Sequence, residues 1–219
     1  MTPAQKGIAD QIDAALPQTQ CTRCGEPDCR RYAEAVARGD APINRCPPGG
    51  DEGVARLAAI TGQPTLALDP THGLPAERGV AVIDEAWCIG CTLCIKACPV
   101  DAIVGSPKQM HVVLKTDCTG CELCIPVCPV DCIELPSVTP GRSGWAAWSD
   151  EQAQTARQRY QARSERLQLE AEELQQRLAA KAEGKLLGLA MEPESDEKAR
   201  KRAVIEAAIA KAKARAKAK

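Results

Sequence analysis

The spacing of apolar residues predicts three short helices in the first 60 residues. Ile8, Ile12 and Leu16 recur at helical spacing, so this stretch is expected to form an amphipathic helix. A second helix is expected over residues 30–38, because Gly39 follows and glycine commonly ends helices. The turn sequence CPPGG then precedes a third helical stretch, GVARLAAI.

Residues 61–79 contain three prolines and three glycines, which predicts a linker. The next region, residues 80–138, is an internal repeat with an offset of 30 residues. Four short apolar stretches, VAVID, VDAIV, MHVVLK and VDCIEL, flank two cysteine-rich loops. This order predicts strand, cysteine loop, helix and strand, twice over, with the two halves paired about a pseudo-twofold axis.

Residues 149–219 are charged and rich in Ala, Gln, Glu, Arg and Lys, a composition that favours helix. Tyr160, Leu167 and Leu174 fall seven residues apart, but the pattern covers at most two and a half heptads, too few for a coiled coil. EPESD, residues 192–196, is expected to break the helix. A second helix is expected to follow and to end in AKAKARAKAK.

Composition indicates a small core and a reducing environment. The chain has 219 residues, no Phe and only five Trp and Tyr side chains, so the core buries little area per residue and metal clusters are obvious stabilising elements. Thirteen cysteines without a secretory signal indicate the cytosol, where cysteine groups are metal sites rather than disulfides. No run of about 18 apolar residues occurs, so no transmembrane helix is expected.

Eight cysteines form two copies of C-x2-C-x2-C-x3-C-P, the spacing that binds 4Fe–4S clusters in bacterial ferredoxins. The first three cysteines of each copy are expected to bind one cluster, and the fourth to bind the other. Cluster A is then assigned Cys88, Cys91, Cys94 and Cys128, and cluster B is assigned Cys118, Cys121, Cys124 and Cys98. Zinc is the alternative, but zinc motifs usually pair two C-x2-C units across a longer gap.

Repeated glycines and prolines flank these cysteines. Gly90 and Gly120 precede the second cysteine of each loop, where glycine lets backbone N–H groups approach the cluster sulfurs. Pro99 and Pro129 follow the last cysteine and are expected to end each turn and fix the chain direction.

The neighbouring side chains are expected to be structural. We expect apolar side chains to bury the clusters and the tryptophan beside the first cysteine to shield its cluster from water. These residues are Ile89, Ile95, Ile125, Val127 and Trp87. Cys132 aligns with Ala102 in the repeat, which predicts a buried small side chain and not a ligand. His111 has no metal partner at motif spacing.

Four more cysteines, the first quartet, precede the repeat with the spacing C-x2-C-x4-C-x16-C. They are Cys21, Cys24, Cys29 and Cys46. This spacing is less specific, and both a 4Fe–4S cluster and zinc fit it.

The predicted fold class is α+β. It comprises a small helical four-cysteine domain, a linker, a two-cluster ferredoxin-like (strand–helix–strand)×2 domain and a charged helical extension. Their ranges are 6–60, 61–79, 80–138 and 149–219.

Charge is uneven along the chain. Residues 1–148 carry a net charge of −5, whereas residues 198–219 carry +8. The basic tail has three interpretations: a solvated helix end, docking to an acidic partner or an anionic membrane surface, and nucleic-acid contact. The last is disfavoured because no aromatic residue lies among the lysines.

The cysteine-containing stretches resemble the B subunit of the Rnf-type electron transport complex over about residues 8–137. They include IDAALPQTQCTRCGEPDCRRYAEAVARGDAPINRCPPGG, DEAWCIGCTLCIKACPVDAI and KTDCTGCELCIPVCPVDCI. The resemblance implies a 4Fe–4S cluster in the first quartet, hence three such clusters. It also implies electron relay between a low-potential carrier and membrane subunits that couple electron flow to ion movement.

Two features depart from this family. Its members usually begin with a transmembrane anchor, but only seven residues precede Ile8, and the basic helical end lies outside the resemblance. These features predict a cytoplasmic protein, or one peripheral to the inner membrane.

The function expected from the sequence is an electron carrier without catalytic residues of its own. Its partners would be redox protein donors and acceptors, with Rnf-type membrane subunits among the candidates. The alternative is a tightly bound electron-transfer subunit of another cytoplasmic redox enzyme. The chain has no Gly-rich phosphate loop and no flavin or nicotinamide fingerprint, so it is not expected to bind NADH.

Overall fold

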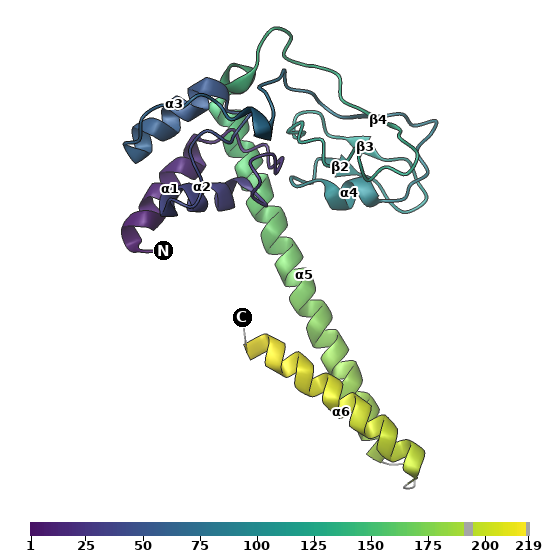
Figure 1. Cartoon of the computed structure of the whole chain (residues 1–219). Coiled ribbons are helices and arrows are strands. Elements are labelled where there is room, and N and C mark those ends of the chain that lie inside the picture. The colour runs from purple at the N-terminus through teal and green to yellow at the C-terminus, as the bar shows by residue number, and fades with distance from the viewer. Residues whose placement is uncertain (191–194, 218–219) are drawn as a thin grey trace. The chain divides into compact units, whose positions relative to one another are not determined.

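The computed structural model describes residues 1–190 and 195–217, and the chain divides into two compact units, residues 1–163 and residues 164–219 (Figure 1). Every cysteine lies in the first unit. No helix among the described residues has the length and apolar character needed to span a bilayer.

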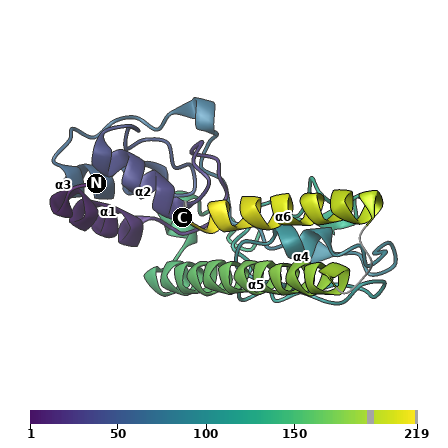
Figure 2. The same ribbon diagram turned by 90° about the horizontal axis from the view of Figure 1, so that it is seen from below.

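Three helices pack together at the start of the chain: α1 (Pro3–Ala15), α2 (Cys29–Arg38) and α3 (Gly50–Thr61) (Figures 1 and 2). All three predicted helices are thus confirmed. Helix α1 begins earlier than the apolar pattern suggests because Thr2 and Gln5 form a capping box. Gly39 ends α2 in the left-handed conformation that glycine adopts without strain.

The core between these helices is small and apolar. Ile12 of α1, Tyr32 of α2 and Leu57 of α3 are almost fully buried in it, together with Leu16, which caps the end of α1. Cys24, Cys29 and Cys46 pack against the same core. The core therefore forms one wall beside the first quartet.

The repeat region contains the four predicted strands, each only two residues long. They are β1 (Val82–Ile83), β2 (Ile103–Val104), β3 (Val112–Val113) and β4 (Ile133–Glu134). The pairs β1–β4 and β2–β3 are antiparallel, with Ile83 opposite Ile133 and Ile103 opposite Val113. Each sheet therefore joins a strand of one half to a strand of the other.

The two cysteine loops share an unusual backbone conformation. Thr92 and Glu122 have φ values of +65° and +66°, and Asp101 and Asp131 have φ values of +50° and +48°. Non-glycine residues rarely adopt this left-handed region. Because residues 30 positions apart share the same rare backbone conformation, the repeat is present in the structure as well as in the sequence.

Only the first half contains the predicted helix, α4 (Leu93–Ala97). In that half the Lys96 N–H donates to the Thr92 carbonyl at 3.2 Å. The repeat places Pro126 opposite Lys96, and proline has no N–H to donate. The second half therefore forms turns instead, so the prediction of a helix in both halves is wrong for residues 123–127.

The linker is largely irregular, with a short 3-10 turn, η1 (Pro70–His72). A second 3-10 turn, η2 (Gly144–Ala147), packs on α3. The Arg56 guanidinium lies 3.9 Å from the ring centre of Trp145 in this turn. The segment after the repeat is thereby joined to the three-helix segment.

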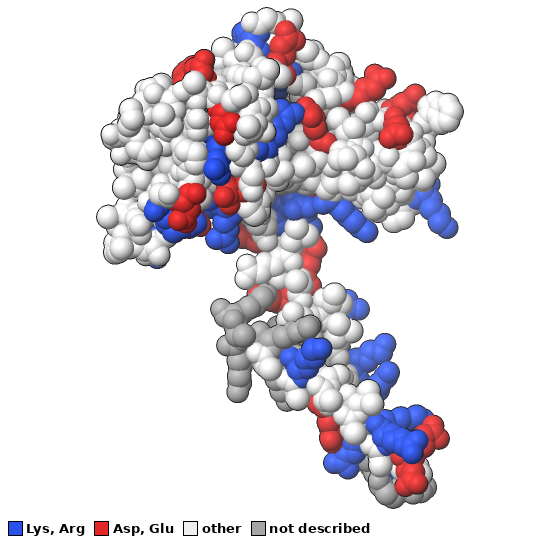
Figure 3. Space-filling model, viewed as in Figure 1, with Lys and Arg blue, Asp and Glu red and all other residues white. Residues whose placement is uncertain are grey.

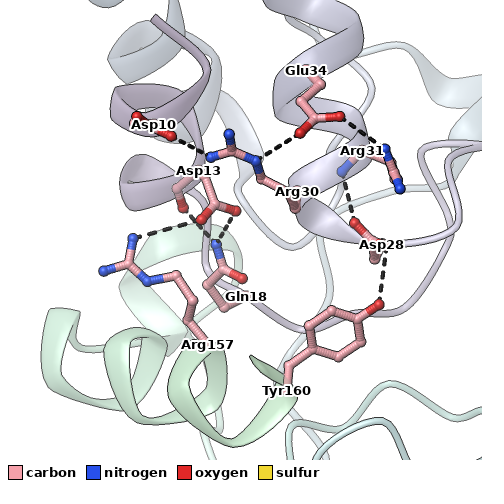
Figure 4. Close-up of polar contacts among 9 residues, drawn as sticks. All are labelled: Asp10, Asp13, Gln18, Asp28, Arg30, Arg31, Glu34, Arg157 and Tyr160. Atoms are coloured by element: carbon pink, nitrogen blue, oxygen red, sulfur yellow. Dashed lines mark hydrogen bonds and ion pairs between the residues drawn. The ribbon is translucent and has the colours of Figure 1, made fainter. Parts of the chain in front are cut away.

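The long helix α5 (Asp150–Ala190) begins inside the first unit. The Tyr160 hydroxyl donates to Asp28 Oδ2 at 3.0 Å, and Arg157 Nη1 lies 3.7 Å from Asp13 Oδ2 (Figure 4). On the repeat side, Arg159 donates to the carbonyls of Val100 and Asp101 at 2.9 and 3.0 Å. The beginning of the predicted extension is thus an integral part of the cysteine-containing unit.

The second unit contains the rest of α5 and α6 (Asp196–Lys217). The face drawn in Figure 3 carries charged side chains of both signs in this unit. Lys201 and Arg202 each pair with a glutamate one turn away, at 2.7 and 2.8 Å. Residues 191–194, which include most of the predicted helix break, and residues 218–219 of the basic tail lie outside the described residues.

Candidate metal centres

The first quartet surrounds one cavity. Its lining includes Leu16, Tyr32 and Pro47 together with the four thiols of Cys21, Cys24, Cys29 and Cys46. The Thr19 hydroxyl donates to Cys21 Sγ at 3.3 Å. Chain turns after α1 and before α3 therefore bring cysteines from both sides of α2 to one apolar chamber.

A second cavity contains cysteines from both halves of the repeat. Cys98 of the first half lines it together with Cys118, Cys121 and Cys124 of the second half. The backbone N–H groups of Ala81 and Ala102 donate to Cys118 Sγ and Cys98 Sγ at 3.4 and 3.2 Å. This group is the set assigned to cluster B from the motif spacing.

Three cysteines of the remaining set belong to the apolar core that also contains Cys132: Cys94 is one of its buried residues, and Cys88 and Cys128 pack against it. Cys88, Cys91 and Cys94 lie on the first loop, and Cys94 is buried. Cys128 Sγ lies 3.5 Å from Cys132 Sγ. These four are the set assigned to cluster A.

Burial makes the free thiolate form of several of these cysteines unfavourable. Burial raises the pKa of the Cys24 thiol to about 11 and the pKa of Cys121 and of Cys124 to about 12. It also raises the pKa of Cys29 and Cys46. Anionic sulfur at these positions therefore requires a bound cation or cationic cluster to offset its charge.

The first quartet and the cluster B set each line a cavity, and their thiols do not meet at a point. Among the residues that the structure describes, no three His, Cys, Asp or Glu side chains converge as ligands of a single metal ion. The cavity of the first quartet and the cavity of the cluster B set each have four cysteines in the wall.

Gly90 and Gly120 have a structural requirement that the motif alone does not reveal. Both are left-handed, with φ of +67° and +65°. A Cβ at Gly120 would lie 2.4 Å from the Gly79 carbonyl oxygen, and one at Gly90 would lie 2.5 Å from the Gln109 nitrogen. Glycine is required here because a neighbouring backbone segment lies against each loop.

Pro99 and Pro129 follow cysteines at which the chain changes direction. Cys98 caps α4 in an extended conformation, with ψ of 118°, and proline disfavours helix at the residue before it. The turn expected at Pro99 is therefore present at the end of α4.

Two expectations about the surroundings of the cysteines are wrong. The Trp87 side chain is 68% exposed and the Ile89 side chain is 58% exposed, so neither shields the loop from water. The N–H groups of Trp87 and Cys88 both donate to the Asp84 carbonyl, which forms a turn. Ile95 and Ile125 do pack against the core, whereas Val127 is 37% exposed.

Sequence reasoning missed the place of His111. Its side chain is 1% exposed, and its Nδ1 lies 3.2 Å from Cys94 Sγ. The offset of the repeat offered a signal, because His111 takes the position of Ala81 in a region that is otherwise closely repeated. Cys132 is buried, as predicted.

A direct contact joins the first quartet to the repeat. Thr119 Oγ1 donates to the Thr19 carbonyl at 3.0 Å, and both residues are buried. Beside it, Arg23 pairs with Glu122 at 2.7 Å. The Cys21 loop and the Cys118–Cys121 loop are therefore neighbours, although about 100 residues separate them in the chain.

Two protein families match the regions that contain these cysteines. Residues 81–135 match a family described as "4Fe-4S dicluster domain", and residues 16–48 match one described as "Putative Fe-S cluster". The first match covers both repeat motifs, and the second covers the whole first quartet.

Curated relatives share the cysteine-containing region. A protein of Alkalilimnicola ehrlichii is 60% identical over 151 residues, which cover 68% of this chain and 81% of the relative. A protein of Hahella chejuensis is 58% identical over 64% of this chain and 70% of the relative. A protein of Thiobacillus denitrificans is 61% identical over 49% of this chain and 57% of the relative. The last alignment thus spans little more than half of its relative. All three are named as the B subunit of an ion-translocating oxidoreductase complex, and the chain belongs to this family.

Proposed function

We propose that this protein relays single electrons through three 4Fe–4S clusters. Cluster A is held by Cys88, Cys91, Cys94 and Cys128, cluster B by Cys118, Cys121, Cys124 and Cys98, and the first-quartet cluster by Cys21, Cys24, Cys29 and Cys46. The observation that carries the proposal is the gathering of cysteines distant in sequence around shared cavities. Among the described residues no three ligand side chains converge on one point, whereas a single zinc ion draws its ligands to a distance of about 2.3 Å.

The contacts between loops support an order for the relay. The Thr119–Thr19 hydrogen bond and the Thr19–Cys21 contact connect the first quartet to the loop of cluster B. Clusters A and B share one apolar core. We therefore infer the order first-quartet cluster, cluster B, cluster A, in either direction of flow.

The residues of the chain hold the clusters and adjust their potentials. Bound clusters supply the one-electron chemistry, and burial with hydrogen bonds to sulfur sets their potentials. The N–H groups of Ala81 and Ala102 donate to two sulfurs of the cluster B set. No proton need accompany the electron, and no catalytic residue is required.

The partners proposed for this chain come from its family. Relatives are named as subunits of an ion-translocating oxidoreductase complex. We propose that this chain passes electrons between a redox protein and membrane subunits of such a complex, at the cytoplasmic face of the inner membrane.

Metal analysis of anaerobically purified protein tests the cluster content. About 12 irons per chain and dithionite-induced bleaching are expected, because each of three cubanes contains four irons. Cys46→Ala should lower the content to about eight, whereas Cys132→Ala, at a cysteine outside the proposed sets, should leave it unchanged. Eight irons and one zinc in the unmodified protein would overturn the assignment of the first quartet.

The alternative is a stable component of another cytoplasmic redox enzyme. Gel filtration of anaerobic lysate separates the two, because a stable heavy complex without membrane subunits would favour the alternative. Failure to bind DNA at any salt concentration would dispose of a nucleic-acid role for the basic tail.

A further inference from the structure

The two halves of the repeat differ at two positions that touch cluster ligands. The 30-residue offset aligns Ala81 with His111 and Ala102 with Cys132. Ala81 and Ala102 contact sulfurs of the cluster B set through their backbone N–H groups. His111 and Cys132 contact sulfurs of the cluster A set through their side chains. Both differences therefore add polar side chains at the same cluster.

His111 is positioned as a hydrogen-bond donor to Cys94. Its Nδ1 lies 3.2 Å from Cys94 Sγ, and its ring is 1% exposed. A thiolate that ligates iron can accept a hydrogen bond but cannot donate one. The imidazole Nδ1 therefore carries the hydrogen in the His111–Cys94 pair. Among the described residues, Nε2 has no hydrogen-bond partner, so the ring is directed by its contact with sulfur.

Gly105 makes room for this ring. A Cβ at Gly105 would lie 2.4 Å from His111 Cδ2, and the φ of Gly105 is +157°. The backbone between β2 and β3 is thus open at the place where the imidazole enters. The ring is held by packing on one side and by sulfur on the other.

Cys132 adds a second donor. Its side chain is 7% exposed, and its Sγ lies 3.5 Å from Cys128 Sγ. When Cys128 is a thiolate ligand, the Cys132 thiol is the only member of this pair that carries a hydrogen. An S–H group is a weak donor, so its effect should be smaller than that of the imidazole.

We propose that His111 and Cys132 act as positioning residues that raise the reduction potential of cluster A. When one electron enters the two-cluster domain, cluster A is then reduced in preference to cluster B. The inference rests on the proposed function. Reduction adds one negative charge to a cluster. Hydrogen-bond donors directed at the cluster sulfurs therefore stabilise the reduced state more than the oxidised state. The potential of cluster A is therefore raised relative to cluster B, because the alanines at these two positions offer cluster B their backbone N–H groups but no side-chain donor.

The test is to find which cluster is reduced first. The Cβ of cysteine is labelled with ¹³C, and the paramagnetically shifted signals are assigned to each cluster by residue. The anaerobic protein is titrated with dithionite as one-electron donor, and the ratio of reduced cluster A to reduced cluster B is measured. We expect cluster A to predominate in the unmodified protein.

Variants identify the cause. His111→Leu should lower the ratio roughly tenfold, which corresponds to about 59 mV for a one-electron couple. His111→Asn, which retains an N–H donor, should restore part of it. Cys132→Ala should lower the ratio less, and Cys132→Ser, which retains a donor, should not lower it. The potential of cluster B serves as an internal control in every variant.

The outcomes separate this inference from the proposed function. Unchanged ratios in variants that retain all their iron would overturn the role of His111 and Cys132, as would a predominance of cluster B in the unmodified protein. Absence of iron from the unmodified repeat would instead refute the proposed function. If His111→Leu does not assemble cluster A, the ratios of His111→Asn and Cys132→Ala decide the matter.

Discussion

Replacement of Thr119 by Val should loosen the junction between the first quartet and cluster B. The hydroxyl of Thr119 donates to the Thr19 carbonyl at 3.0 Å, and both residues are only 4% exposed. Valine has nearly the same shape, so the main change is a buried carbonyl without its donor. Such a group costs about 1–3 kcal/mol.

The assay is the rate at which visible absorbance is lost in guanidinium under anaerobic conditions. Cluster loss is irreversible, so a rate is the appropriate measure of stability. If the bond is broken before the rate-limiting step, the rate should rise roughly 5-fold to 150-fold, since about 1.36 kcal/mol is a factor of ten. Hydrogen exchange should increase around Cys21 at the same time.

Thr116→Val is the matched control. Thr116 is in the same loop but exposed, and the one partner of its hydroxyl among the described residues is Asp117 Oδ1, at 3.5 Å. The control should stay within a factor of about two of the unmodified protein, because surface substitutions usually change stability by less than about 0.5 kcal/mol. Equal rates for the two variants would show that the junction does not depend on this bond.

Three further predictions concern packing around the clusters. Gly120→Ala should abolish cluster B and lower the iron content to about eight, because the added Cβ would lie 2.4 Å from the Gly79 carbonyl oxygen. Gly141→Ala is the control, because Gly141 also has a positive φ, +73°, but no neighbour within 4 Å of an added Cβ. This control should retain all of the roughly 12 irons and lose about 1–2 kcal/mol of folding stability. Arg159→Met should raise the rate of cluster loss about 30-fold, because it removes two charged hydrogen bonds to backbone carbonyls that together contribute about 2 kcal/mol. Arg166→Met, which removes an exposed ion pair, should change this rate less than about threefold. Similar rates for the two variants would refute the role of Arg159. Removal of residues 164–219 should leave the iron content unchanged, but removal of residues 149–219 should lower it, since Arg157, Arg159 and Tyr160 would be lost; equal iron contents would contradict the packing of α5 on the first unit.

Much of the local structure follows from patterns that are short in sequence. The cysteine spacing predicts the cluster loops, because three of the four ligands of each ferredoxin cluster come from residues three positions apart. Gly39 predicts the end of α2, and the four apolar stretches predict the four strands. The absence of a helix from the second half could also have been predicted from the sequence, because Pro126 lacks the N–H group that Lys96 donates at the equivalent position.

The contacts that bring the sites together depend on packing between distant segments. No local pattern marks Thr119 as the partner of Thr19, since 100 residues separate them and each is an ordinary polar residue. Tyr160 fits a heptad stripe in the sequence, yet its hydroxyl donates to Asp28 at the start of α2. Such pairs form only after the segments have folded against each other.

The ligand types and the spacing within each cysteine loop are thus encoded locally, because three ligands of a ferredoxin-type cluster come from one short loop. The contact between the Cys21 loop and the Cys118–Cys121 loop, and the presence of His111 beside Cys94, are decided by the tertiary structure. Side chains in a buried core contact residues from several segments at once, so their partners are set by how those segments pack rather than by their sequence neighbours.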